Sequence, residues 1–594
     1  MTDRDGLRRR AIELGVETSY WDVAGELHHA PEETLRAVVD VLEADAAAGG
    51  IRQFDPVIVA PAPRLPVGML TDVQLTLSDG TTIELRPDEG MASLPPDLPV
   101  GCHRLAGSSG GAEEVSTVVV PPPSMPRDPT IAGGVGLFVP TYALWEPDAP
   151  LPSFAHLEAL AERAPRLGVE VISTLPLYAA FLDEPFDPSP YAPMSRLHWN
   201  EVYIDDAALP AAPYPDQMDL IDWRALARRR RLQLLDLGGD LEPRLRAAVV
   251  QFVHARPDVA DYARYRAARR DPMDAGRPVA VVKLSHELAQ YLAHRQLGAV
   301  QGPGRAVLGL DLPIGSHPHG YETWSHDALF APAMSVGAPP DEFFADGQNW
   351  GFPPQLPAAG RRSGHELWRR LVAVAGGPAS MLRIDHVMGV QRLWWIPEGA
   401  SARDGVYVRY PREELLAVIA AQAAVTDTTI VGEDLGTVPA ELTDAMERWD
   451  MLGLFEEQFL LYRDDDDLDP VPARSVAGIR THDMPAFAAA VTGDAAGGVT
   501  RYRRLVAAAV GRPVGASASD LLEAALERVA ASDAYLVLVD LDDLGGETEP
   551  HNVPGQVLPT TWRRRLRAPT SEVLATHEVR RRLKLLASRR GGTR

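Results

Sequence analysis

The chain has 594 residues, too many for one ordinary domain, so we expect two or three. Its 45% hydrophobic and 24% charged residues are typical of a globular protein, and one cysteine, Cys102, excludes an internal disulfide and a cysteine metal cluster. The formal net charge of −24 excludes nucleic acid and anionic membranes as electrostatically favoured partners and suits a neutral ligand.

The first region, residues 1–50, is predicted to be a helical segment. It opens with MTDRDGLRRRAIELG, which lacks the apolar run of a signal peptide. APEETLRAVVDVLEAD follows, with acidic residues in its first turn and apolar residues at helical spacing. No later window approaches the roughly 18 uncharged apolar residues that a membrane span needs. We therefore expect a cytoplasmic protein.

The second region, residues 51–125, is predicted to be a β-sandwich domain. DVQLTLSDGTTIELRP and EVSTVVVPPP are examples of its short β-type runs, which Gly, Pro and Asp-Gly turns separate. The proline-rich PPPSMPRDP then leads into the third region, residues 126–594.

The third region alternates strand-like and helical segments. GVGLFVPTYA is followed by the helical SFAHLEALAERAPRLG and by the strand-like VEVISTLPLYA, and later apolar runs end in polar residues. This alternation predicts an α/β fold with a parallel sheet, and its length favours a (β/α)8 TIM barrel with inserted helical subdomains. A doubly wound sheet is the alternative, but neither a G-x-G-x-x-G sequence nor a Walker motif accompanies it.

Three of these strand ends carry acids: Asp385 in MLRIDHVMGV, Glu433 in VGEDLG and Asp483 in THDMP. Each acid alone could simply cap the next helix. One or two strand–helix units separate them, however, so all three could face the carboxyl end of one barrel, where barrel enzymes hold their active sites. Arg383 and His386 flank the first acid and His482 flanks the third, which favours a catalytic site.

Such a trio suits retaining glycoside chemistry. One carboxylate attacks the sugar, a second acid protonates the leaving oxygen and later acts as a base, and a third holds ring hydroxyls. We expect Arg383 to keep Asp385 ionised through its opposite charge. Glu433 has to be protonated at the first step, which calls for burial or a neighbouring acid.

Six segments in this order resemble glycoside hydrolase family 77, the 4-α-glucanotransferases or amylomaltases. They are SPYAPMSRLHWNEVYID, VGAPPDEFFADGQNWGFPP, LRIDHVMGVQRLWWIPEG, VGEDLGTVP, THDMP and NVPGQVLPTTWRR. The two regions before residue 125 also look like those of the longer bacterial members. The chain departs from the family pattern at residues 142–154 and 316–320, which leaves donor and acceptor preference open.

The resemblance implies a role for each matching residue. Asp385 matches the nucleophile that forms a covalent glucosyl-enzyme, Glu433 the general acid/base and Asp483 the transition-state stabiliser. It also implies a substrate-binding set and no metal or organic cofactor. The expected substrate-binding residues are Tyr191, Arg383, His386 and His482 in the bowl, and Asp341, Gln348 and Trp350 on a loop that covers the glucan.

The implied activity is transfer of α-1,4-glucan segments between maltooligosaccharides or glycogen-derived glucans. The residues alone predict only a retaining α-glucan enzyme, so two alternatives stay open: an amylase-like hydrolase and a catalytically inactive glucan-binding protein. The sequence also leaves open whether the protein is a monomer or a homodimer.

Overall fold

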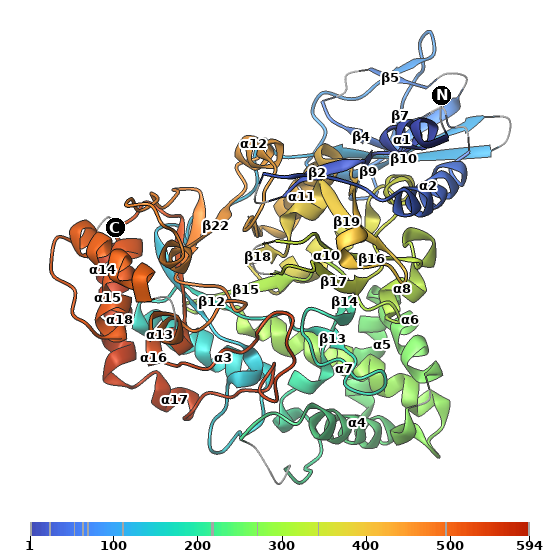
Figure 1. Cartoon of the computed structure of the whole chain (residues 1–594). Coiled ribbons are helices and arrows are strands. Elements are labelled where there is room, and N and C mark those ends of the chain that lie inside the picture. The colour runs from blue at the N-terminus through green and yellow to red at the C-terminus, as the bar shows by residue number, and fades with distance from the viewer. Residues whose placement is uncertain are drawn as a thin grey trace.

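The computed structural model describes residues 3–22, 25–50, 52, 54–61, 64–67, 70–109, 112–214, 219–269, 271–341, 344–492 and 496–591. Its centre is a ring of eight parallel strands (Figure 1), in the order β21-β18-β15-β12-β11-β24-β23-β22. The ring closes where the Gly432 N–H donates to the Leu452 carbonyl at 2.8 Å. The predicted (β/α)8 barrel is therefore confirmed. Its strands are β11 (Gly134–Phe138), β12 (Val171–Ser173), β15 (Val307–Leu312), β18 (Met381–Ile384), β21 (Thr429–Gly432), β22 (Gly453–Glu456), β23 (Ser475–Gly478) and β24 (Leu536–Asp540).

Side chains at alternate positions fill the barrel interior. The deep layer is an apolar cluster that includes Val171, Met381, Val431 and Val476. Two residues further along β18 and β21 the interior positions become Arg383 and Glu433. The barrel interior thus changes from apolar to charged toward its carboxyl end.

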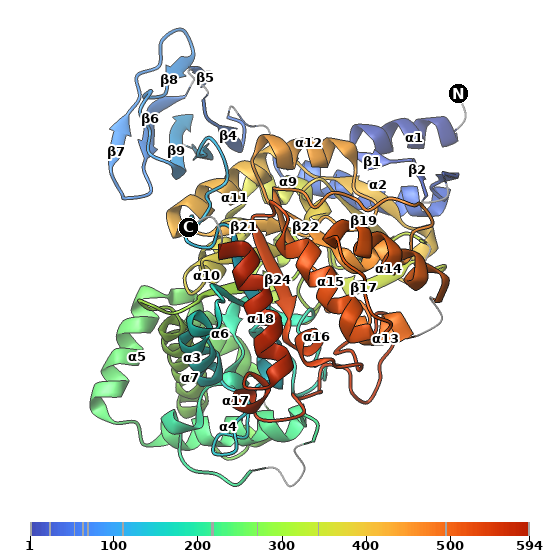
Figure 2. The ribbon, with the colours of Figure 1, turned by 90° about the vertical axis from the view of Figure 1, so that its left-hand side faces the viewer.

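Helices cover the outside of the barrel, and Figure 2 shows α15 and α18 lying together on one side. Helix α15 starts with a capping box between Ser517 and Asp520 and buries an apolar face that includes Leu522 and Leu526. The helices that follow barrel strands are α3 (Phe154–Arg163), α10 (Glu366–Gly376), α11 (Arg412–Thr426), α12 (Ala440–Arg448), α13 (Phe487–Thr492), α14 (Ala496–Val510), α15 (Ala518–Ala530), α16 (Leu541–Gly545), α17 (Thr570–Val573) and α18 (His577–Arg590).

A long insertion separates β12 from β15 and forms the green lower part of Figure 1. Its hairpin carries the Ser-Pro-Tyr segment toward the barrel mouth, and its helices pack on one another. The insertion contains β13 (Tyr178–Ala180), β14 (Pro193–Trp199), α4 (Trp223–Gly239), α5 (Pro243–Ala255), α6 (Pro257–Ala268) and α7 (Val279–Val300).

Two further insertions, one between β15 and β18 and one between β18 and β21, build a five-stranded sheet together with β1, in the order β1-β20-β19-β16-β17. Strand β1 (Val16–Glu17) comes from the N-terminal region, where only helices were expected, and it pairs antiparallel with β20 (Val406–Arg409). Helices α1 (Asp3–Glu13) and α2 (Glu32–Ala47) pack on this sheet through a shared apolar cluster. The remaining elements here are β2 (Ser19–Trp21), β3 (Leu27–His29), α8 (Tyr321–Ser325), β16 (Met334–Ala338), β17 (Gln348–Phe352), α9 (Pro357–Arg362) and β19 (Arg392–Pro397).

The β-sandwich predicted ahead of the barrel combines a five-stranded and a two-stranded sheet, and Figure 2 shows it projecting beyond α11. Val57 and Val119 of the larger sheet pack on Val418 of α11, which attaches this part to the barrel. No helix among the described residues is long and apolar enough to cross a membrane. The strands are β4 (Val57–Val59), β5 (Arg64–Pro66), β6 (Thr71–Thr76), β7 (Thr82–Glu84), β8 (Met91–Ser93), β9 (Gly101–Ser109) and β10 (Ala112–Val120).

Candidate active site

The three predicted acids lie at or beyond the carboxyl ends of three barrel strands. Asp385 directly follows β18, Glu433 directly follows β21, and Asp483 lies in the loop after β23. The backbone N–H of Asp385 donates to the Leu312 carbonyl at 3.0 Å, and that of Glu433 donates to the Ile384 carbonyl at 2.9 Å. These bonds extend the barrel ladder by one residue, so rigid backbone holds both acids.

Arg383 connects the first acid to a residue that the sequence analysis missed. Its Nη1 donates to Asp385 Oδ1 at 2.9 Å and to both carboxylate oxygens of Asp311 at 2.8 Å. Asp311 lies in β15 and is only 3% exposed. The sequence could have indicated Asp311, because it is an acid inside the apolar run GRAVLGLDLPIG, and a buried carboxylate needs a charged partner.

The charges around Asp385 do not simply keep it ionised. Burial raises the pKa of Asp385 to about 7, Arg383 opposes that rise, and the carboxylates of Asp311 and Glu433 add to it. The expectation that Arg383 keeps Asp385 ionised is therefore wrong, because burial and the neighbouring acids outweigh a guanidinium that also binds Asp311.

Glu433 is held next to Asp385 by backbone donors. Its Oε2 accepts the N–H of His386 at 2.9 Å and its Oε1 accepts the N–H of Leu435 at 2.9 Å. His386 follows Asp385 in the chain and adopts a φ of 47°, in the left-handed region. Burial lowers the pKa of the His386 imidazole, so its ring is neutral near pH 7.

Asp483 has its own pair of donors. Asn552 Nδ2 donates to Asp483 Oδ1 at 2.7 Å, and His482 Nε2 lies 3.3 Å from Asp483 Oδ2. Burial acts to raise the pKa of Asp483, but His482, Asn552 and Arg383 outweigh it and lower the pKa to about 2. Asp483 is therefore ionised at neutral pH. Asn552 belongs to the segment NVPGQVLPTTWRR, but nothing in the sequence marked it as a partner of Asp483.

Tyr191 joins these groups from the hairpin of the first insertion. Its ring stacks on His482 with centroids 4.8 Å apart and an interplanar angle of 9°. Its hydroxyl donates to Asp311 Oδ2 at 2.6 Å. Trp562 lies at 6.0 Å from Tyr191 and 6.1 Å from His482, ring centroid to centroid, and supports both from behind.

The expected cover loop reaches the site through β17. The Trp350 ring meets the His386 ring edge-on at 5.1 Å, and Trp350 Nε1 donates to Gln348 Oε1 at 3.4 Å. Asp341 instead accepts the Phe344 N–H at 2.6 Å. A pocket of about 40 Å³ beneath β17 is lined by Asp385, His386 and Phe352, so open space adjoins the first acid.

Comparison with known proteins gives the family. Residues 139–571 match glycoside hydrolase family 77, described as 4-alpha-glucanotransferase. The chain belongs to this family. This family 77 enzyme is 29% identical over 590 residues to the 4-alpha-glucanotransferase of Mycobacterium tuberculosis, covering 82% of this chain and 80% of that one. It is 27% identical to the 4-alpha-glucanotransferase of Haemophilus influenzae, covering 81% and 80%. It is an enzyme of the 4-α-glucanotransferase class.

Solved structures agree on the fold of this family 77 enzyme. The amylomaltase of Corynebacterium glutamicum superposes with a TM-score of 0.85 at 22% identity, covering 98% of this chain and 99% of that one. An amylomaltase from Streptococcus agalactiae, in complex with acarbose, superposes with a TM-score of 0.67 at 20% identity, covering 77% and 99%.

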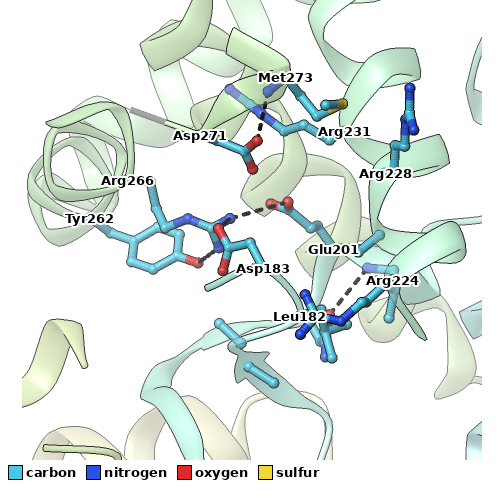
Figure 3. A pocket seen from close by; sticks show the side chains of 15 residues that line it. Leu182, Asp183, Glu201, Arg224, Arg228, Arg231, Tyr262, Arg266, Asp271 and Met273 are labelled. Carbon is cyan, nitrogen blue, oxygen red and sulfur yellow. Dashed lines mark hydrogen bonds and ion pairs between the residues drawn. The ribbon is translucent and has the colours of Figure 1, made fainter. Parts of the chain in front are cut away.

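A larger cavity, of about 160 Å³, opens in the helical insertion of the family 77 enzyme (Figure 3). Figure 3 shows Arg266 pointing between two acids, with its Nη2 3.7 Å from Glu201 Oε1 and 3.8 Å from Asp183 Oδ2. None of the predicted site residues lines it. Asp385, by contrast, lines the smaller pocket beneath β17.

Proposed function

We propose that this chain transfers α-1,4-glucan segments between maltooligosaccharides through a covalent glucosyl-enzyme on Asp385. The observation that carries the proposal is the pairing of Asp385 and Glu433. The backbone N–H next to Asp385 is itself a hydrogen-bond donor to Glu433. Two carboxyl groups that follow adjacent barrel strands suit the retaining reaction, in which one attacks the sugar while the other transfers the proton.

The reaction takes two displacements. The Asp385 carboxylate attacks the anomeric carbon, the glycosidic bond breaks, and Glu433 gives its proton to the leaving oxygen. An acceptor 4-hydroxyl then gives its proton to Glu433 and attacks the same carbon, and the ester bond to Asp385 breaks. Both groups end in their starting states.

Asp483 and Tyr191 act on the sugar during these steps. Asp483 is ionised and half-exposed, with a side chain 48% accessible, so it is available to ring hydroxyls of a bound glucose. Asn552 and His482 fix its direction. The Tyr191 ring, stacked on His482, offers a flat apolar surface to the sugar.

Asp385 attacks only in its ionised form, which fixes the acid side of the pH profile. Burial and neighbouring acids raise its pKa to about 7 in the free enzyme. The rate constant kcat/KM should therefore rise with pH on the acid side of neutrality, as the ionised fraction of Asp385 grows.

Transfer outcompetes hydrolysis when an acceptor hydroxyl is held against the ester and water is kept out. Trp350 of β17, in contact with His386, is the residue best situated to do this. Gln348 beside it and Asp341 at the loop turn complete the covering segment. The substrates are maltooligosaccharides or glycogen-derived α-1,4-glucans, in line with the family.

Product analysis on maltotriose tests the function. A transferase releases glucose together with oligomers longer than maltotriose, whereas an amylase-like hydrolase releases reducing ends without any longer product. An inactive glucan-binding protein binds maltotriose without turnover. Asp385→Asn is the control, since it keeps the fold but removes the attacking carboxylate. A product mixture in which nothing exceeds maltotriose would exclude the transferase.

A further inference from the structure

Glu456 is a buried acid of the barrel that the reaction above does not use. It is the last residue of β22, two residues after Leu454, which packs with the apolar layer of the barrel interior. Because strand side chains alternate, Glu456 points into the same interior. It lies in the charged layer near the carboxyl end of the barrel, within electrostatic reach of Arg383 and Glu433.

The barrel provides a slot for this side chain. Glu456 pairs with Gly478 of β23, and a Cβ atom at Gly478 would lie 2.7 Å from Glu456 Oε2 and 2.9 Å from the Leu538 carbonyl. Only a glycine at this position leaves room for the carboxyl group. Glu456 is 9% exposed, and its Oε2 has no hydrogen-bond partner among the described residues.

The charged groups around Glu456 come from four elements. Arg383 faces it from β18, Arg480 from the loop after β23, Glu433 from the end of β21 and Asp543 from α16. Both arginines are already committed elsewhere. Arg383 binds Asp311 and Asp385, and Arg480 binds Asp540 at 2.9 Å and Asp543 at 2.8 Å.

An ionised Glu456 would therefore carry a buried oxygen, Oε2, without a hydrogen-bond donor, which is costly. Burial raises the pKa of Glu456 to about 8, although Arg383 and Arg480 act against that rise. Arg383 could compensate the negative charge of an ionised Glu456, but it would have to turn away from Asp385 to do so.

We propose that Glu456 is a positioning residue that supports the glucan-transfer reaction only while uncharged, and that its ionisation turns the enzyme off by competing for Arg383. This rests on the function proposed above. Uncharged Glu456 fills its slot and leaves Arg383 to Asp311 and Asp385. Once ionised, it draws the guanidinium down into the barrel and leaves Asp385 without its cation.

The experiment compares the pH dependence of kcat/KM on maltotriose for the wild type and Glu456→Gln, which mimics the protonated form. Whatever its value at pH 7, the ratio of Glu456→Gln to wild type should rise about tenfold by pH 9, because a group with a pKa near 8 is mostly neutral at the first pH and mostly ionised at the second. Glu441→Gln, which changes an exposed acid at the start of α12, is the matched control and should give a flat ratio. A flat ratio for Glu456→Gln would overturn the proposal.

Thermal unfolding without substrate is the second measurement. The folded protein keeps the Glu456 proton to a higher pH than the unfolded chain does, so the wild type loses stability as pH rises between the two pKa values. The Tm advantage of Glu456→Gln should widen from pH 5 to pH 8 and then level off. A constant Tm difference would contradict the proposal, as would failure of both Glu456→Gln and Glu456→Met to fold. If wild-type protein leaves maltotriose unchanged, the proposed function fails, while the Tm comparison still tests Glu456.

Discussion

At the scale of single residues, the site consists of buried acids and arginines in which one arginine pairs with more than one acid. Asp385, Glu433 and Asp483 could be predicted from the sequence because each follows an apolar run at a strand end. The roles of Asp311 and Glu456 could not, because the charged groups around each of them come from other strands and loops of the barrel. Which acids share Arg383 is decided only when the barrel closes.

Asp311→Asn tests this sharing. The amide removes a negative charge that raises the pKa of Asp385, and it frees Arg383 to serve Asp385 alone. Both effects lower the pKa of Asp385, so the acid limb of the kcat/KM profile should move to lower pH. The maximal rate should fall roughly 10²-fold, because the amide has one acceptor oxygen where the carboxylate has two, so it cannot accept from both Arg383 and the Tyr191 hydroxyl in the same way. An acid limb that stays in place or moves upward would contradict the account.

At the scale of elements, the barrel strands and the helical insertion could be predicted from apolar periodicity. The sheet formed by β1, β20, β19, β16 and β17 could not. Strand β1 has two residues, and its partner β20 lies nearly four hundred residues further along the chain, so local sequence carries no sign of the pairing. This sheet matters for function because it holds Trp350 against His386.

Gly337→Ala tests the role of that sheet. A Cβ at Gly337 would lie 2.0 Å from the Gln348 carbonyl oxygen and 2.7 Å from Ile396 Cδ1, so β17 has to move away from β16. Overpacking of this kind costs about 1–3 kcal/mol. We expect a raised KM for maltotriose and a larger share of hydrolysis as Trp350 shifts.

Gly298→Ala is the control for this change, because a Cβ there meets nothing within 4 Å and the residue lies in helix α7. It should leave the KM and the product distribution unchanged. An unaltered ratio of transfer to hydrolysis in Gly337→Ala would show that the position of β17 does not influence the competition between transfer and hydrolysis.

At the scale of the whole molecule, the protein carries a net charge of −24, whereas its proposed glucan substrate is neutral. A neutral glucan gains nothing from the field of the protein, so long-range steering plays no part in its capture. The charges that matter are buried ones at the barrel mouth, such as the Arg383–Asp311 pair, which salt screens weakly.

The rate should depend only weakly on salt, because the charges that matter are buried. Between 0.05 and 0.5 M NaCl, kcat/KM on maltotriose should change by less than about twofold. Added salt screens exposed charges and leaves buried ion pairs almost unaffected. The measurement is a steady-state series at constant pH. A tenfold decline would mean that surface charge takes part in substrate capture.

The central claim is that Asp385 attacks the anomeric carbon. The most direct measurement is to trap the intermediate with a fluorinated glucosyl fluoride, which slows breakdown of the ester, and to map the added mass by peptide mass spectrometry. The account predicts one glucosyl adduct on the peptide that contains Asp385, and none in Asp385→Asn. An adduct on a different residue, or undiminished labelling of Asp385→Asn, would contradict it.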